Sequence, residues 1–320
     1  MALITQEEAT WFSHVYDGMV ANIERAIIGK TDVIKSAVAC LFSQGHLLLE
    51  DVTGSGKTTL ARALARGVYG SQSRIQFTAD LQPSDITGVV LFDERTDRYR
   101  LHPGPIFNSI IVADEINRAS PRTQSALLEV MEEGRVTVQG VTNTVGPPFM
   151  VIATQNPIDH EGTFPLPVAQ LDRFLLRLHL GYPDPDSTVR LLDEAAIRDR
   201  SSLIEPILDT PSLAKACAIA NCVYVDPSVL RYVVDLTEAT RHTDSVVNGI
   251  SVRGAMSFVR AVKTWAVAHG RTHVLPRDVQ ELAHQVLEHR IMVRPDAQRD
   301  GVTATSVIDD VLAKTPEPTG

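Results

Sequence analysis

The chain has 320 residues, of which 44% are hydrophobic and 22% are charged, and this composition is that of a globular protein with room for two domains. The formal net charge of −9 gives no general attraction for nucleic-acid phosphates, so it disfavours a nucleic-acid partner. The sequence has no run of about 18 apolar residues and begins without a signal-peptide pattern, so we expect a cytoplasmic protein with no membrane segment.

The first 45 residues have the apolar spacing of two helices. Ile23, Ala26 and Ile27 recur at helical intervals. The segment 28–30 interrupts this pattern, and apolar residues recur again over 33–41. We therefore expect two helices before the first strand.

Five short apolar runs follow, with turns or helical patterns between them. Most are apolar without strict alternation, as in strands that are buried on both faces of a parallel sheet. The runs are 46–50, 74–78, 110–114, 149–154 and 174–180. This order predicts an α/β fold with a five-stranded parallel sheet and right-handed crossovers.

One helix and one hairpin have clear boundaries between the third and fourth runs. Ser120 followed by Pro121 is a typical helix start, and Gly134 predicts the end of that helix. Residues 135–145 then alternate around a Gln-Gly pair, which predicts a β-hairpin.

The Pro-rich segment 182–186 divides the chain in two. Beyond it, apolar residues recur at helical spacing, which predicts a small all-α domain. We expect an α/β core over 1–183, the helical domain over 184–298 and a disordered tail over 299–320.

The most specific motif is a glycine-rich loop directly after the first strand and directly before a helix. Such a loop points backbone N–H groups and the positive end of a helix dipole at phosphates. Lys57 is expected to reach the β- and γ-phosphates, and Thr58 to ligate Mg²⁺. The strict pattern has glycine where this chain has Asp51, and the alternative is a glycine-rich turn without a ligand. The expected nucleotide contacts are Thr53, Gly54, Ser55, Gly56, Lys57, Thr58 and Thr59.

Two acids end the third apolar run. Asp114 and Glu115 lie where parallel α/β sheets bind ligands, at the carboxyl end of a strand. Asp114 is expected to hold Mg²⁺, directly or through water, and Glu115 to orient or deprotonate the attacking water. Alone, the pair also fits a solvated acidic turn, but the phosphate loop upstream favours the functional interpretation.

Three further polar residues are candidates for the same site. Asn156 follows the fourth run and has two interpretations, a water-positioning residue near the γ-phosphate or an Asn-Pro turn. Arg173 precedes the fifth run, and Arg253 begins a later helix. Each arginine fits a guanidinium that stabilises the transferred phosphoryl group, from the same chain or a neighbour, and each also fits a surface salt bridge.

The three cysteines are odd in number and match no metal-binding spacing. We interpret Cys40, Cys217 and Cys222 as reduced thiols. The alternative is a redox or metal pair formed by Cys217 and Cys222.

The motif-bearing segments resemble the MoxR family of AAA+ ATPases. The resemblance covers about residues 28–294 and rests on LLLEDVTGSGKTTLARALA, IIVADEINRASPRTQSALLEVMEEGRVTV, FMVIATQNPIDHEGTFPLPVAQLDRF and the following GYP. It implies a P-loop AAA+ core followed by an all-α lid, with ATP and Mg²⁺ as cofactors.

The resemblance also assigns roles to single residues. Lys57 and Thr58 match the Walker A motif, and Asp114 and Glu115 match Walker B. Asn156 matches sensor 1.

Two arginines and two loop segments take roles in the same way. Arg253 matches the sensor 2 arginine that contacts the nucleotide of its own chain, and Arg173 resembles the arginine finger that reaches a neighbour's nucleotide. Ile28 and Gly29 resemble the adenine-pocket segment. Asn117 and Arg118 fall in a region of subunit contact.

The family resemblance implies a ring-forming ATPase, expected to be a hexamer. Two inserted hairpins, at about 88–102 and 135–145, are expected to face the ring pore or a partner. The implied output is chaperone-like remodelling of a protein that arrives in trans, for example one with a von Willebrand factor A domain. The alternatives are a chelatase motor subunit, a nucleic-acid motor of the same clade and a nucleotide-switched scaffold.

Overall fold

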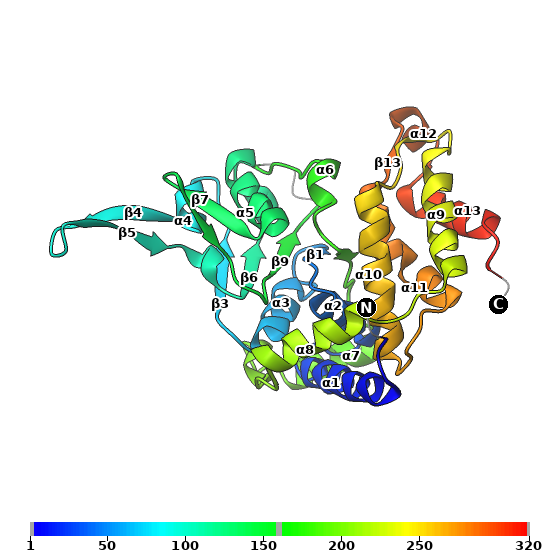
Figure 1. Cartoon of the computed structure of the whole chain (residues 1–320), viewed down its shortest axis with the longest axis horizontal. Helices are drawn as coiled ribbons and strands as arrows, with labels where there is room; N and C mark the ends of the chain where they lie inside the picture. The colour runs from blue at the N-terminus through cyan, green and yellow to red at the C-terminus, as the bar shows by residue number, and fades with distance from the viewer. Residues whose placement is uncertain (1–2, 158–161, 319–320) are drawn as a thin grey trace.

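The computed structural model describes residues 3–157 and 162–318, and a five-stranded parallel sheet lies at its centre (Figure 1). The strand order is β10-β1-β9-β6-β3. The strands are β1 Leu47–Glu50, β3 Gln72–Gln76, β6 Ile110–Asp114, β9 Met150–Gln155 and β10 Leu176–Leu178. The five apolar runs are confirmed as these strands, and β3 begins two residues earlier than the predicted run.

Helices cover both faces of the sheet. Leu47 and Leu49 pack into the hydrophobic cluster that also holds the first helices, and Leu48 packs into the cluster on the opposite face. This burial on both faces explains why the strands do not alternate between apolar and polar residues. The core helices are α1 Gln6–Glu24, α2 Thr31–Phe42, α3 Lys57–Arg66, α4 Pro83–Thr87, α5 Pro121–Glu133 and α6 Val168–Leu171.

The boundaries of α5 agree with the sequence prediction. The Ser120 side chain accepts a hydrogen bond from the Thr123 N–H, and Gly134 ends the helix with φ 63°. The predicted hairpin follows as β7 Arg135–Val138 and β8 Val141–Thr144.

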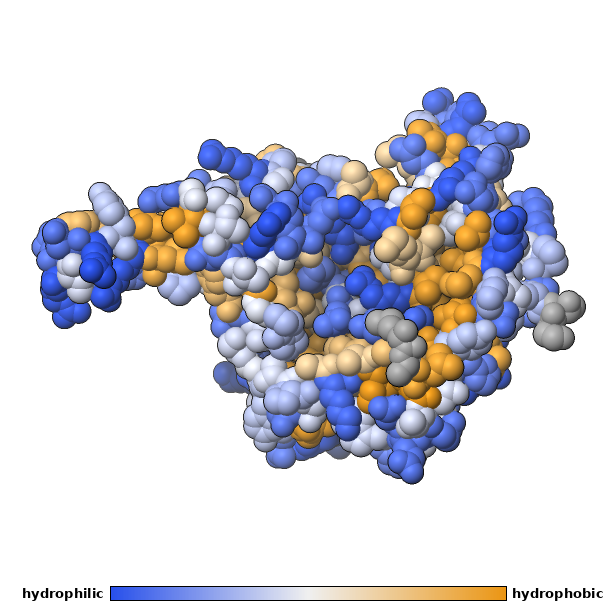
Figure 2. Space-filling model, in the orientation of Figure 1, coloured by the Kyte–Doolittle hydropathy of each residue, from blue (hydrophilic) through white to orange (hydrophobic). Residues whose placement is uncertain are grey.

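A second hairpin projects from the core (Figure 1). It consists of β4 Gly88–Asp93 and β5 Arg98–Pro103, which pair antiparallel. Apolar side chains line the middle of this arm and hydrophilic ones cover its tip (Figure 2). Leu91, Phe92 and Tyr99 are among the exposed apolar residues. Exposed apolar residues on such an arm are typical of a contact surface.

The second domain is helical, as predicted, with two short additions of β-structure. β11 Leu208–Asp209 pairs with β2 Val68–Tyr69 of the core, and β12 Val246–Asn248 pairs with β13 Met292–Val293. The boundary at residue 184 stays a prediction. The helices are α7 Pro185–Asp193, α8 Thr210–Asn221, α9 Pro227–Arg241, α10 Val252–Ala268, α11 Pro276–Leu287, α12 Pro295–Arg299 and α13 Ala304–Lys314.

The expected disordered tail over 299–320 is wrong for helix α13. Its N-cap Thr303 accepts a hydrogen bond from the Ser306 N–H. Val307, Ile308 and Val311 are buried, and the helix packs on α9 and α11. The apolar face is only about one turn long, so the polar composition around it concealed the helix. Residues 319–320 lie outside the described part of the chain.

All three cysteines are free thiols, and two of them are buried. Burial raises the pKa of Cys40 and of Cys217 to about 12, so both thiols are protonated at neutral pH. Among residues 3–157 and 162–318, no three His, Cys, Asp or Glu side chains cluster as metal ligands. Within the same ranges no helix combines the length and hydropathy needed to cross a bilayer.

His46 makes the stability of the core depend on pH. Its Nδ1 accepts from the Val151 N–H at 3.0 Å, its Nε2 lies 3.0 Å from the Met131 carbonyl oxygen, and burial lowers its pKa to about 4. As the pH falls, His46 therefore takes up its proton near pH 6.5 in the unfolded chain but only near pH 4 in the folded chain.

We expect this difference to remove about 3 kcal/mol from the free energy of unfolding between pH 6.5 and pH 4. His46→Gln, which has no titrating group, should show a correspondingly smaller loss. Urea denaturation at pH 7 and pH 4.5 measures both. Equal pH dependence in the two proteins would show that His46 is not the group responsible.

Candidate functional site

The loop between β1 and α3 has a backbone suited to anions. Gly54 and Gly56 have φ values of 84° and 96°, a left-handed region in which side chains other than glycine are strained. Gly56 is the N-cap of α3, so the first N–H groups of that helix face the loop. The Ser55 hydroxyl is buried and has no hydrogen-bond partner among the described residues. An oxyanion in the loop satisfies these donors.

Lys57 and Asp51 hold this loop in shape. The Lys57 Nζ donates to the carbonyl oxygens of Asp51, at 2.5 Å, and of Val52, at 2.6 Å. The Asp51 carboxylate accepts from the Val52 N–H at 2.8 Å and from the Gly181 N–H at 2.5 Å. Asp51 does not have a positive φ, so its position does not require the glycine of the strict motif. Its side chain ties the loop to the segment that leads into the second domain.

Asp114 receives three side-chain hydrogen bonds at the end of β6. Its Oδ1 accepts from the hydroxyls of Thr58, at 3.0 Å, and Thr154, at 3.3 Å. Its Oδ2 accepts from Arg74 Nε at 2.6 Å. The predicted Thr58–Asp114 pair is therefore brought together, and its oxygen ligands are the type that Mg²⁺ prefers. Because Asp114 is already bonded through both oxygens, it fits a metal best through an intervening water.

Glu115 lies beside Asp114 in a strained backbone conformation. Its φ and ψ are 56° and 50°, and its N–H donates to the Thr154 hydroxyl at 3.0 Å. Such left-handed residues are rare outside glycine and concentrate at functional sites. Its carboxylate accepts from Gln76 Nε2 at 3.1 Å and pairs with Arg118 at 3.2 Å.

The sequence interpretation missed Arg74 and Gln76, which reach the two acids from β3. The register pairs Gln76 with Asp114, so alternate β3 side chains face the acids. The signal available in the sequence was this pair of polar residues, two positions apart in one strand of the sheet.

Asn156 lies next to the phosphate loop, at the end of β9. Its Nδ2 donates to the Thr53 hydroxyl at 3.1 Å, and its backbone oxygen accepts from Asn117 Nδ2 at 3.1 Å. Asn117 is buried and supports this strand end. Its expected place in a region of subunit contact stays a prediction.

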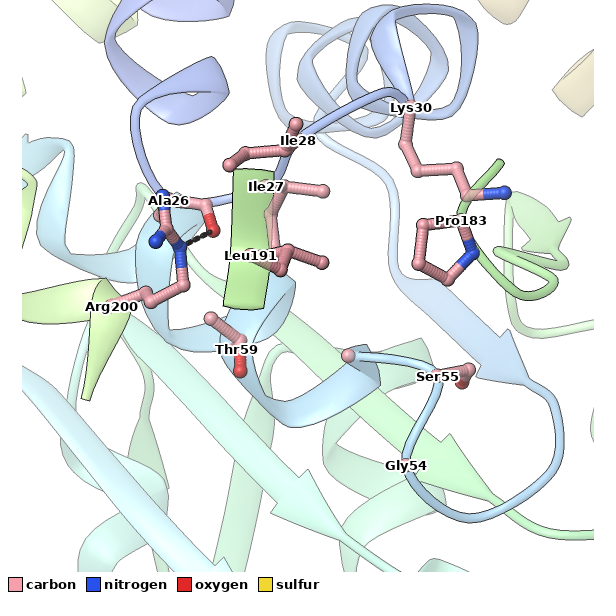
Figure 3. A pocket seen from close by; sticks show the side chains of 11 residues that line it. Ala26, Ile27, Ile28, Lys30, Gly54, Ser55, Thr59, Pro183, Leu191 and Arg200 are labelled. Carbon is pink, nitrogen blue, oxygen red and sulfur yellow. Dashed lines mark hydrogen bonds between the residues drawn. The ribbon is translucent and has the colours of Figure 1, made fainter. Parts of the chain in front are cut away.

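Two adjoining pockets surround the loop and share Gly54, Gly56 and Thr59. The polar pocket, of about 280 Å³, is lined by Lys57, Thr58, Glu115 and Asn156 among others. The apolar pocket, of about 200 Å³, is drawn in Figure 3. Its lining includes Ala26, Ile27, Ile28, Pro183, Leu191 and Arg200.

Gly29 lies beside α7 in a conformation that requires glycine, and its expected contact with the nucleotide stays a prediction. A Cβ at this position would lie 2.1 Å from the Ser187 hydroxyl, and Gly29 has a φ of 73°. Glycine therefore lets α7 approach the edge of the apolar pocket, while Ile28 lines the pocket itself. The two pockets together suit a nucleotide, because the apolar pocket fits a base and the polar pocket fits phosphates.

Comparison with known proteins identifies the family. Residues 46–176 match the model of the ATPase family associated with various cellular activities, and residues 238–311 match the AAA lid domain. The chain is 37% identical over 308 residues to chaperone MoxR1 of Mycobacterium tuberculosis, covering 93% of this chain and 81% of that protein. The chain belongs to the MoxR family of AAA+ ATPases.

Other relatives match the MoxR-family chain over nearly its full length. Protein MoxR of Paracoccus denitrificans is 31% identical, covering 96% of this chain and 97% of that protein. The uncharacterised protein YeaC of Bacillus subtilis is 44% identical, covering 92% of each chain. A crystal structure of an ATPase candidate from Cytophaga hutchinsonii superposes with a TM-score of 0.89, at 31% identity and 98% coverage of both chains. These matches show the AAA+ fold with its helical lid.

The two arginines that complete the predicted MoxR-type site lie together, away from the phosphate loop. Arg173 Nε pairs with Glu132 at 2.8 Å, and Arg253 pairs with the other oxygen of the same carboxylate. Desolvation opposes ionisation of Glu132, but the hydrogen bonds and charges of these arginines hold its pKa below the usual range. Both line one pocket with Arg260, at the amino ends of the strands.

The position of Arg253 differs from the expected contact with its own nucleotide. The phosphate loop lies at the carboxyl ends of the strands, whereas Arg253 lies in the first turn of α10 and lines one pocket with Arg173, shortly before β10. Among the described residues, Arg253 lines neither of the two pockets around the loop.

The lid holds the segment that carries Arg173. Arg290 is 3% exposed, and its Nε donates to the Asp172 carboxylate at 2.7 Å. Its other nitrogens donate to the carbonyl oxygens of Phe174 and Leu175. Ser251, the N-cap of α10, donates to Asp172 at 3.1 Å. A movement of the lid therefore moves this segment.

Proposed function

We propose that this MoxR-family chain is a Mg²⁺-dependent ATPase that binds ATP across the two pockets around the phosphate loop. The observation that carries the proposal is the convergence of the loop, the Thr58–Asp114 pair, Glu115 and Asn156 on one polar pocket. The buried Ser55 hydroxyl supports it, because a phosphate oxygen gives this group the partner that it lacks.

Each residue in the polar pocket has a step to perform. Lys57 exchanges its loop carbonyls for the β- and γ-phosphates, and Asn156 positions the attacking water. Glu115 orients that water and accepts its proton. Thr58, and Asp114 through a water, would hold Mg²⁺, which would supply positive charge to the phosphates.

The ATPase acts as a ring of identical chains, in this proposal a hexamer. A head-to-tail interface brings the carboxyl ends of the strands in one chain to the amino ends of the strands in the next chain. Repeated rotation closes such contacts into a ring. Arg173 and Arg253 then act together on the neighbour's γ-phosphate, because both lie at the amino edge. This assignment replaces the same-chain role first expected for Arg253.

The output that we propose is chaperone-like remodelling of a protein partner in trans, such as one with a von Willebrand factor A domain. The similarity to a protein named chaperone MoxR1 supports this proposal. The projecting β4–β5 hairpin, with exposed Leu91, Phe92 and Tyr99, offers apolar contact surface for a partner.

We expect ATP turnover per chain to rise with protein concentration. The phosphate loop and the arginines come from different copies, so an isolated chain lacks a complete site. Phosphate release measured between low nanomolar and micromolar protein tests this, with sedimentation recording the assembly. Turnover that is independent of concentration would contradict the shared site, and assembled chains that bind ATP without turnover would favour a nucleotide-switched scaffold.

A further inference from the structure

The pocket at the amino edge of the sheet has one basic wall made by a single helix face. Arg253, Ser257 and Arg260 of α10 line it at spacings of four and three residues, which places them on one face. The pocket volume is about 370 Å³. The other lining residues are Gln44, His46, Met131, Glu132, Asp172 and Arg173.

Three arginines line this pocket, Arg173, Arg253 and Arg260. Of the three, Arg260 is the one whose guanidinium makes no hydrogen bond or ion pair to the described residues. Its Nε is shielded from solvent and has no acceptor. Burial lowers the pKa of Arg260 from its ordinary value, yet a guanidinium stays protonated in proteins. No carboxylate of the described residues neutralises this charge, and the Nε is buried without an acceptor, so an anion in the pocket would stabilise Arg260.

The pocket also has an excess of positive charge. Glu132 is already shared by Arg173 and Arg253, and Asp172 is held by Arg290. Neither carboxylate pairs with Arg260. The pocket therefore has more guanidinium groups than its own acids neutralise, which is the electrostatic environment of an oxyanion site.

The two arginines of α10 line the same pocket, so both can contact one anion in it. Arg253 and Arg260 are seven residues apart, or about 10 Å along the axis. This offset is within the combined reach of two long arginine side chains that enter one pocket from the same helix face. Arginine forks fit the oxygens of a phosphate group.

We propose that Arg260 is a third arginine of the site shared between chains, and that this pocket binds the terminal phosphate of ATP held by a second copy of the chain. The proposal rests on the proposed ATPase function and deepens it. Arg173 and Arg253 must leave Glu132 to reach that phosphate, whereas Arg260 has no bond to break. Arg260 is therefore available to the incoming phosphate before the other two.

The first test compares ATP turnover of Arg260→Gln with that of Arg231→Gln, whose arginine is exposed on α9 and paired with Asp235. We expect Arg260→Gln to lose about tenfold to a hundredfold, the range for a hydrogen bond to a charged group. Arg231→Gln should match wild type, and ATP binding to dilute chains should be unchanged in both. Wild-type turnover in Arg260→Gln would overturn the proposal.

Mixing variants tests whether Arg260 acts across the interface. Arg260→Gln retains Glu115, and Glu115→Gln supplies an intact Arg260 to its neighbour. A mixture should therefore regain part of the turnover that each variant lacks alone. A mixture no more active than the sum of its components would place Arg260 within its own site and overturn the proposal.

A binding readout separates this inference from the ATPase proposal. In the Glu115→Gln background, adding Arg260→Gln should raise the protein concentration needed for ATP-dependent association about tenfold, as measured by sedimentation. Adding Arg231→Gln should not. This result needs no hydrolysis, so an inactive wild type defeats the ATPase proposal alone, and unchanged association defeats this one.

Free phosphate is the other source of the same anion. Inorganic phosphate titrated into Lys57→Ala, whose own loop is disabled, reports on the pocket alone. Binding by dilute, unassembled chains that is lost on adding Arg260→Gln, with unchanged ATP-dependent association, would assign the pocket to a free anion and overturn the proposal. Absence of such binding agrees with a phosphate delivered by the second copy.

Discussion

Arg173→Ala is expected to reduce ATP turnover at least about 10³-fold while leaving ATP binding to dilute chains unchanged. An arginine that stabilises charge on the transferred phosphoryl group contributes about 10³–10⁵ in kcat. Arg173 lies at the opposite edge of the sheet from the phosphate loop of its own chain, so its loss does not alter that loop. Steady-state turnover and equilibrium binding of a fluorescent ATP analogue measure the two effects separately.

Arg135→Ala is the matched control for Arg173→Ala. Arg135 is exposed near the same end of α5 and pairs with Glu133, so its loss removes an equal charge outside the pocket. Its turnover should stay within about twofold of wild type, because surface ion pairs contribute little. A mixture of Arg173→Ala with Glu115→Gln should recover activity. No recovery would mean that Arg173 acts within its own chain.

The sequence was sufficient to predict the five strands because each buried strand is mostly apolar on both faces. Leu47, Leu48 and Leu49 are all fully buried, and a short apolar run of this kind indicates a central parallel strand in a chain whose strands alternate with helices. The phosphate loop was equally clear, because its glycines are required by φ values of 84° and 96°. In both cases the residue types of a short segment follow from the burial or the backbone conformation of that same segment.

The contacts that were missed depend on tertiary register. Arg74 reaches Asp114 only because β3 lies at the edge of the sheet beside β6, with Ile75 opposite Ala113. A shift of one residue would turn Arg74 to the other face. The sequence of β3 alone does not fix that pairing.

The arginine cluster was missed for a related reason. Arg173 and Arg253 lie far apart in the sequence, and the order of motifs along the chain does not show which edge of the sheet each one reaches. Their common partner, Glu132, belongs to a third element, α5. The packing of the lid, including the Arg290–Asp172 pair, brings these elements together.

This packing joins the segment beside Arg173 to the lid. Helix α7 contributes Leu191 to the apolar pocket, and the lid contributes Arg290 to the segment beside Arg173. If ATP binding moves the lid, Arg173 moves with it. In the ring that we propose, this movement would reach the next chain.

Glu115→Gln is expected to reduce ATP turnover about 10²–10⁴-fold, the usual contribution of a general base. The amide keeps the size of the carboxylate and the same backbone requirement at φ 56°, but it does not accept a proton from water. ATP binding should persist, because Lys57 and Thr58 are untouched. Single-turnover hydrolysis and filter binding of labelled ATP measure the two properties.

Glu129→Gln is the control for this change, since Glu129 is exposed on α5 and loses the same charge. It should retain turnover within about twofold of wild type, as do most surface substitutions. If Glu115→Gln keeps turnover within about tenfold of wild type, another group activates the water. If it loses ATP binding instead, the bonds of Glu115 to Gln76 and Arg118 shape the pocket, and its role is structural. Retained binding with lost turnover is the outcome that assigns proton acceptance to Glu115.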